Sequence, residues 1–116
     1  MTAIELGEDG YLLRIFIGES DRIHGRLLYE WIVAEARRRD LAGATVLRGI
    51  MGFGANSRIH AARIERLSED LPVVIELVDT HDKLEAFLAA IEPHIREGLA
   101  TLEKANVRFY RSRPAD

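Results

Sequence analysis

Apolar and other residues alternate along two stretches of the chain, residues 11–17 and 71–79. A period of two is typical of a β-strand, and in the second stretch Val73 and Leu77 fall on the same face. The first stretch is apolar on nearly both of its faces. Pro72 fits only at the start of its strand, because proline cannot donate a hydrogen bond to a neighbouring strand. The pattern therefore predicts two strands with apolar surface to bury.

Two further stretches have apolar residues at the three-to-four spacing of an amphipathic helix. The first follows the Glu-Ser-Asp sequence at 19–21, which offers a cap and early negative charge, and runs to about Asp40. Thr80 can cap the second, and Pro93 ends or restarts it. The apolar stripes are Ile23, Leu27, Leu28, Trp31 and Ile32 in the first stretch, and Leu84, Phe87, Leu88, Ile91 and Ile95 in the second.

Residues 44–54 predict one more strand, and residues 99–102 and 107–110 predict one interrupted strand or two short ones. The resulting order, βαββαβ, is that of the ferredoxin-like α+β fold, with two helices on one face of a four-stranded antiparallel sheet. The other face of the sheet carries apolar residues too. Burial of that face would need another subunit.

The composition is that of one compact domain, with 116 residues of which 47% are hydrophobic and 30% charged. A net charge of −3 argues against a nucleic-acid partner. The chain has no cysteine, which excludes disulfides, thiolate metal sites and thiol nucleophiles. The start of the chain is acidic rather than basic and apolar, so we expect a cytoplasmic protein. So small a domain has little room for a deep pocket, and we expect any ligand site to lie between subunits.

The sequence Gly-Phe-Gly-Ala-Asn-Ser at 52–57 leaves the predicted strand and enters a long connection. Its glycines either bring backbone N–H groups close to a phosphate or only permit the turn out of the sheet. It is one residue short of the dinucleotide fingerprint and lacks the βαβ unit that the fingerprint requires. Arg58, His60, Arg63 and Arg66 follow, which favours either an anionic ligand or a solvated loop face.

Other candidate chemistry is weak. The four histidines fall in four different predicted elements, and no two of them have the spacing of metal ligands. Ser57 and His60 lack a nucleophile elbow, and Glu76 and Asp79 point to opposite faces of their strand. We therefore predict neither a resident metal nor an enzyme.

Several segments together resemble the domain-of-unknown-function 190 family, also called UPF0166. They are residues 18–21, 28–30, 43–54, 58–60 and 67–79, so the resemblance covers nearly the whole chain. That family is similar in fold to the PII signal-transduction proteins and, more distantly, to the CutA-type trimers. The resemblance implies a single PII-like domain over 1–116 and a homotrimer with its open sheet faces packed inward. It also implies an N-terminal extension over about 1–10, a T-loop-like excursion over 55–70 and a polar tail over 111–116.

The Gly-Phe-Gly, the long loop and the following Leu-Pro strand are similar to the surroundings of the PII T-loop. PII proteins bind an adenine nucleotide in the cleft between subunits, against the base of that loop and arginines near the C-terminus. The resemblance implies AMP, ADP or ATP as ligand. The chain lacks the glycine-rich, lysine-bearing loop that PII places before its last strand, which argues against a triphosphate. The loop is also shorter and lacks the modified tyrosine of PII.

We therefore predict a non-enzymatic PII-like regulator that binds a small anionic ligand at subunit clefts. It would signal through the 55–70 loop to a protein partner, such as a membrane transporter or channel. A CutA-like metal-handling trimer is the alternative. The predicted ligand-binding residues are Gly52, Phe53, Gly54, Asn56, Arg58, His60, Arg108 and Arg111.

Overall fold

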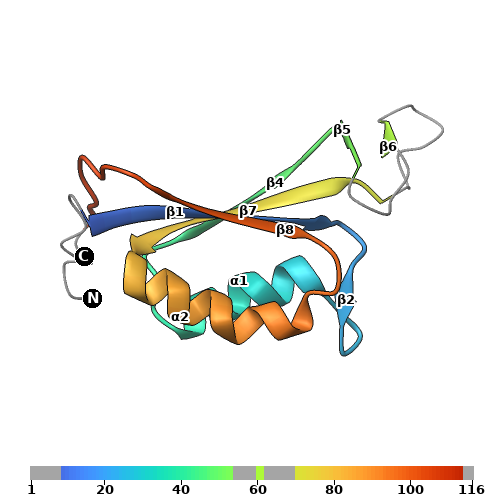
Figure 1. The fold of residues 1–116 in the computed structure, drawn as a ribbon, viewed down its shortest axis with the longest axis horizontal. Helices are drawn as coiled ribbons and strands as arrows, with labels where there is room; N and C mark the ends of the chain where they lie inside the picture. The colour runs from blue at the N-terminus through green and yellow to red at the C-terminus, as the bar shows by residue number, and fades with distance from the viewer. Residues whose placement is uncertain (1–8, 54–59, 62–69, 114–116) are drawn as a thin grey trace.

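The computed structural model describes residues 9–53, 60–61 and 70–113 (Figure 1). In chain order the elements are β1 (Gly10–Gly18), β2 (Arg22–Ile23), β3 (Arg26–Leu27), α1 (Leu28–Arg38), β4 (Ala44–Arg48), β5 (Met51–Gly52), β6 (His60–Ala61), β7 (Pro72–Thr80), α2 (His81–Ile91), the 3-10 turn η3 (Glu92–His94) and β8 (Leu99–Lys104). Neither helix in these ranges is long and apolar enough to cross a membrane.

The main sheet has the strand order β4-β7-β1-β8, and all of its pairings are antiparallel. Both helices lie on one side of this sheet, and its other side is open in the single chain (Figure 1). The short β5 and β6 pair with each other beyond the main sheet. This arrangement confirms the predicted ferredoxin-like α+β fold.

The core lies between the sheet and the two helices. Alternate residues of β1 and β7 point into it, as the period of two predicts. The helices contribute apolar stripes that face these strand residues. Its buried residues include Leu13, Ile15, Ile17, Val73, Ile75 and Leu77 from the sheet, and Leu28, Ile32, Leu84, Phe87 and Ile91 from the helices.

The first helix begins at Leu28, several residues later than the sequence pattern predicts. The Asp21 carboxylate does not cap a helix; it accepts a 3.0 Å hydrogen bond from the backbone amide of Gly18, which closes a turn. The β2–β3 hairpin follows, and its Ile23 side chain reaches the core from there. The predicted helix start was wrong because Ile23, the buried residue of a largely exposed hairpin, falls at the same spacing as an apolar residue on a helix.

The predicted strand over 44–54 is also shorter. It ends at Arg48, and the amide of Gly49 then donates a 2.7 Å hydrogen bond to the carbonyl of Pro72 as the chain turns toward β5. The second helix is capped as predicted, because the Thr80 hydroxyl accepts a hydrogen bond from the Lys83 amide (3.4 Å). It ends at Ile91, where η3 begins.

Residues 107–110 form no strand, contrary to the prediction. After β8 the chain leaves the sheet edge and crosses the end of the sheet instead (Figure 1). We call residues 105–113 the C-terminal segment.

Candidate functional site

The predicted ligand-binding residues lie at two opposite ends of the sheet. Gly52 and Phe53 follow β4 at the end where β1 finishes and β7 begins, which we call the loop-base end. Arg108 and Arg111 lie on the C-terminal segment at the other end, which we call the C-terminal end (Figure 1). The nine residues of β7 separate the two ends by about 26 Å at the usual rise per residue. One chain therefore does not bring the two groups together.

Some predicted residues cannot be placed in this way. Gly54, Asn56 and Arg58 lie outside the described residues, and His60 is described only as backbone in the short strand β6. Their part in a site stays a prediction.

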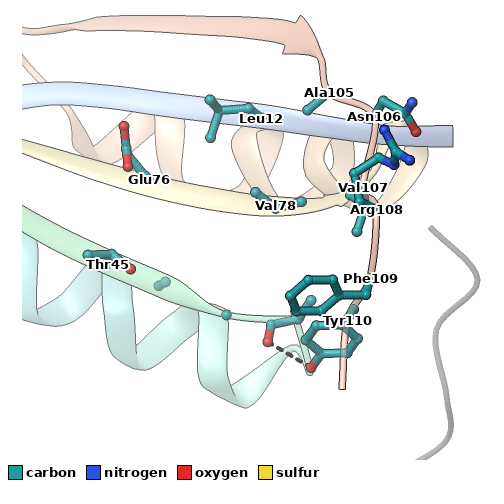
Figure 2. Close-up of a pocket in the computed structure, with 13 residues that line it drawn as sticks. Leu12, Thr45, Glu76, Val78, Ala105, Asn106, Val107, Arg108, Phe109 and Tyr110 are labelled. Atoms are coloured by element: carbon teal, nitrogen blue, oxygen red, sulfur yellow. Dashed lines mark hydrogen bonds between the residues drawn. The ribbon is translucent and has the colours of Figure 1, made fainter. Parts of the chain in front are cut away.

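A groove with a volume of about 620 Å³ lies at the C-terminal end, between the open side of the sheet and the C-terminal segment (Figure 2). The sheet and the C-terminal segment both contribute apolar residues to its lining. Its polar groups include a guanidinium, a carboxylate, an amide and two hydroxyls. The residues are Leu12, Ala42, Gly43, Ala44, Thr45, Glu76, Val78, Ala105, Asn106, Val107, Arg108, Phe109 and Tyr110. Arg108 is thus the predicted arginine that lines the groove; Arg111 is not part of the lining.

Hydrogen bonds fasten the C-terminal segment at two points. At its start, the Ala105 amide donates to the carbonyl of Gly10 (2.9 Å). Further along, the Tyr110 hydroxyl donates to the carbonyl of Ala42 (2.9 Å), a contact drawn in Figure 2. The segment between these points forms one wall of the groove, so its position depends on the loop before β4.

Phe109 stands at this wall with 69% of its surface exposed. The guanidinium carbon of Arg111 lies 4.8 Å from the centre of its ring, which is a cation–π contact. An exposed aromatic ring in contact with the Arg111 guanidinium combines a flat apolar surface with positive charge. Such a surface suits a ligand that has both a planar ring and an anionic group.

The open side of the sheet carries an apolar row near the loop-base end. The strand register aligns Leu47 with Val74, Val74 with Phe16, and Phe16 with Leu99, so each of the four strands contributes one residue. Leu47 and Leu99 are about half exposed or more, at 49% and 59%. We call these four residues the apolar row.

The chain beyond β4 adds more exposed apolar surface at the same end of the sheet. Ile50, Met51 and Phe53 are 77%, 61% and 71% exposed. Large exposed apolar surfaces of this kind mark interaction sites. Phe53 therefore lies beside a candidate interface as well as at the predicted loop base.

An ionic cluster separates the apolar row from the groove. Arg14 donates to Glu76 on the neighbouring strand (2.9 Å) and to Glu103 on the other side (2.5 Å). The hydrogen bond with Glu76 raises the pKa of Arg14, and desolvation partly opposes this effect. The Glu76 carboxylate thus belongs both to the groove lining and to the central charge pair.

At the loop-base end, polar contacts fix the points where the chain leaves and re-enters the sheet. Asp70 accepts a hydrogen bond from the Ser20 amide (2.7 Å), and the Glu19 amide donates to the carbonyl of Leu71 (2.8 Å). Glu19 also pairs with Arg48. The sequence pattern did not predict this role, because residues 19–21 also fit a helix cap.

Gly18 belongs to the same set of contacts. A Cβ atom there would come within 2.5 Å of a carboxylate oxygen of Asp70, so a larger residue at position 18 would displace that carboxylate from its present position. No group of three or more histidine, aspartate or glutamate side chains able to hold a metal occurs within the described ranges.

The family of the chain follows from its sequence relatives. The family model DUF190, described as "Uncharacterized ACR", matches residues 10–107, and the chain belongs to that family. It is 38% identical over 98 residues to a UPF0166 protein of Aquifex aeolicus, covering 84% of this chain and 92% of the relative. It is 34% identical over 97 residues to a UPF0166 protein of Methanocaldococcus jannaschii, covering 83% and 89%. The predicted family is confirmed.

Solved structures of CPII, a nitrogen regulatory PII-like protein from Thiomonas intermedia K12, have a similar fold. The structure with ADP, AMP and bicarbonate superposes with a TM-score of 0.62 at 14% identity, over 84% of this chain and 93% of CPII. The structure with ADP and bicarbonate gives 0.63 at 16% identity, over 84% and 87%. The likeness confirms the PII-like fold.

Proposed function

We propose that this chain is a non-enzymatic PII-like regulator that binds an adenine nucleotide in clefts between the subunits of a homotrimer. The observation that carries the proposal is the separation of the loop-base and C-terminal ends by the length of β7. A site that uses Phe53 and Arg108 together needs the loop-base end of one copy next to the C-terminal end of another.

The open side of the sheet supports such an assembly. The apolar row and the exposed Ile50, Met51 and Phe53 place apolar surface at one end of the chain. The groove at the other end has apolar walls. When two different surfaces of a protein fit each other, copies join head to tail and close into a ring if the rotation allows it.

The C-terminal end supports a nucleotide as ligand. A volume of about 620 Å³ is in the range of small-molecule sites. The Arg108 guanidinium suits a phosphate, and the exposed ring of Phe109 offers a stacking surface for a base. CPII, which shares the fold, has been solved with ADP and AMP. We favour AMP or ADP over ATP, because the chain lacks the glycine-rich, lysine-bearing loop of PII proteins.

Occupancy of the cleft would be passed on through residues 55–70, which begin directly after the loop base. Arg58 and His60 in that stretch supply positive charge to contact an anionic ligand. A protein partner, such as a membrane transporter or channel, would bind according to the conformation of this loop. The ligand acts only through a difference in its affinity for the two states of the loop.

Calorimetric titration of tag-free protein with AMP, ADP, ATP and cyclic dinucleotides tests the proposal. We expect AMP or ADP to bind, and Arg108→Ala to weaken binding by at least about tenfold through loss of a charged hydrogen bond. Arg113→Ala is the matched control, because Arg113 is an exposed arginine of the same segment that does not line the groove. Absence of binding by the natural protein, or equal affinity in the Arg108→Ala variant, contradicts the proposal.

A further inference from the structure

Three aromatic side chains meet on the helix side of the sheet, opposite the groove and the apolar row. His24 lies at the tip of the β2–β3 hairpin, His94 is the last residue of η3, and Trp31 lies on α1. The ring centres of His24 and His94 are 6.4 Å apart, and those of Trp31 and His94 are 5.0 Å apart. The sequence showed no histidine pair at metal-ligand spacing, and the fold brings this one together from distant parts of the chain.

The backbone under each histidine is anchored. His24 and Gly25 have positive φ values of 48° and 80°, and they form the two-residue turn of the hairpin. The preceding Ile23 is 7% exposed and holds the hairpin against the core. On the other side, the fully buried Ile91 comes directly before η3. Both imidazoles therefore project from fixed points, which lowers the entropic cost of binding one ligand with both.

Two imidazoles suit a late transition metal. Each binds such an ion through one nitrogen at about 2.0–2.1 Å, so two ring centres lie about 4.5 Å apart when their nitrogens are at a right angle and about 6.4 Å apart when the nitrogens are on opposite sides of the ion. The observed 6.4 Å matches two imidazoles on opposite sides of one ion, an arrangement that square-planar or tetragonal Cu²⁺ and Ni²⁺ accept and tetrahedral Zn²⁺ does not. Both side chains are exposed, so an ion can reach them and keep its waters.

Among the described residues no third candidate ligand joins the pair, which narrows the choice of ion. The chain has no cysteine, and the part of it that the structure describes holds no cluster of three or more candidate ligands. Water is available to fill the remaining positions. Nitrogen ligands of this kind favour Cu²⁺ over Ni²⁺ and Zn²⁺, whereas Mg²⁺ and Ca²⁺ require oxygen ligands.

We propose that His24 and His94 together bind one late first-row transition-metal ion, with Cu²⁺ bound most tightly. The ion joins the β2–β3 hairpin to the connection between α2 and β8 and so stabilises the folded chain. It sits beside Trp31, which is the only tryptophan of the chain. The site is separate from the proposed nucleotide cleft, and neither proposal depends on the other.

Tryptophan fluorescence of tag-free, chelator-treated protein provides the test. We expect Cu²⁺ to quench Trp31 in a saturable manner with one ion per chain by native mass spectrometry, Ni²⁺ to need a higher concentration, and Mg²⁺ to have no effect. His24→Asn keeps a residue that tolerates positive φ. This variant and His94→Gln should each weaken Cu²⁺ binding by at least about tenfold, since each removes one of two ligands.

His81→Gln is the control. His81 is an exposed histidine that contacts Tyr11 and Asp82 instead of the pair, so its loss should leave the Cu²⁺ titration unchanged. Circular dichroism verifies that each variant is folded. Quenching that does not saturate in the natural protein, or that is unchanged in the folded double variant His24→Asn, His94→Gln, overturns the proposal.

Discussion

The backbone amide of Ala42 donates a 2.9 Å hydrogen bond to the carboxylate of Asp79, a side chain that is completely buried. The same carboxylate accepts from the Thr80 amide (2.7 Å) and lies 3.5 Å from the ammonium group of Lys83. The carbonyl of Ala42 in turn accepts from Tyr110. One buried carboxylate at the end of β7 therefore supports the loop before β4, and that loop holds the C-terminal segment.

Asp79→Ala should lower the free energy of unfolding by about 2–3 kcal/mol, because it leaves two backbone amides without their acceptor. Chemical denaturation at a fixed protein concentration measures the change. Asp82→Ala is the control, since the Asp82 side chain is fully exposed and its removal should cost less than about 1 kcal/mol. Equal losses in the two variants would show that Asp79 does not support the loop.

Tyr110→Phe should loosen the C-terminal segment while the core stays intact. The variant loses the hydrogen bond to Ala42, worth about 0.5–1.5 kcal/mol. We expect faster tryptic cleavage after Arg108 and Arg111, with a small change in global stability. Tyr29→Phe, on α1, should leave the cleavage rate unchanged. An unaltered rate in Tyr110→Phe would mean that other contacts fix the segment.

Leu47→Asp should disrupt the assembly without unfolding the chain. Leu47 belongs to the apolar row on the outer strand β4 and is 49% exposed in the single chain, so the subunit tolerates a charge there. In an interface the buried carboxylate would be strongly unfavourable. Native mass spectrometry should find three times 13.1 kDa for the natural protein and 13.1 kDa for the variant.

Ala89→Asp is the control for the assembly. Ala89 is an exposed residue of α2, on the other side of the sheet, and its substitution should leave the trimer intact. A natural protein of 13.1 kDa, or a Leu47→Asp variant that still forms trimers, would exclude the apolar row as the interface.

Glu35 gives the stability of α1 a dependence on pH. Its hydrogen bond with Arg38 (2.6 Å) lowers the pKa of Glu35, with burial acting in the opposite direction and Arg39 assisting. A carboxyl with a lowered pKa in the folded state stabilises the protein above its unfolded pKa of about 4.3, and this effect is lost as the pH falls through the folded value.

Glu35→Gln should therefore be less stable than the natural protein at pH 7, by less than about 1 kcal/mol. The difference should shrink as the pH falls below about 4.3 and vanish once the native carboxyl is protonated. Thermal unfolding of both proteins between pH 7 and pH 3 measures it. A difference that stays constant over this range would argue against an ionic contribution from Glu35.

The sequence predicts β1, β7 and the α2 cap because each of these patterns is compatible with a single local structure. Alternation in the two long strands reflects a buried face, and only Thr80 is placed to cap the helix that follows. The start of α1 could not be predicted in the same way. Asp21 has two local partners available, the first turn of a helix or the amide of Gly18, and the periodicity does not distinguish them.

Of the predicted site residues, Arg108 is the one that lines the groove, and the arrangement of the groove could not be predicted. The Gly-Phe-Gly sequence and the arginines near the C-terminus can be recognised in the sequence. The path of the C-terminal segment across the sheet end depends on Tyr110 reaching a carbonyl 68 positions away, which no local pattern encodes. The contact between His24 and His94 has the same origin in tertiary packing.

The central claim is that each ligand site combines the loop-base end of one chain with the C-terminal end of another, and a mixing experiment tests it most directly. One variant carries Phe53→Ala and Arg58→Ala, and the other carries Arg108→Ala and Arg111→Ala. Each alone should bind ADP at least about tenfold more weakly than the natural protein, since each lacks one half of every cleft.

Unfolding and refolding the two variants together produces mixed trimers, whose formation native mass spectrometry verifies. In such a trimer, a cleft between the intact loop base of one chain and the intact C-terminal segment of its neighbour is complete. Calorimetry should then recover ADP binding of natural affinity, with at most one site per mixed trimer. Mixed trimers that bind ADP no better than either variant alone would contradict the account.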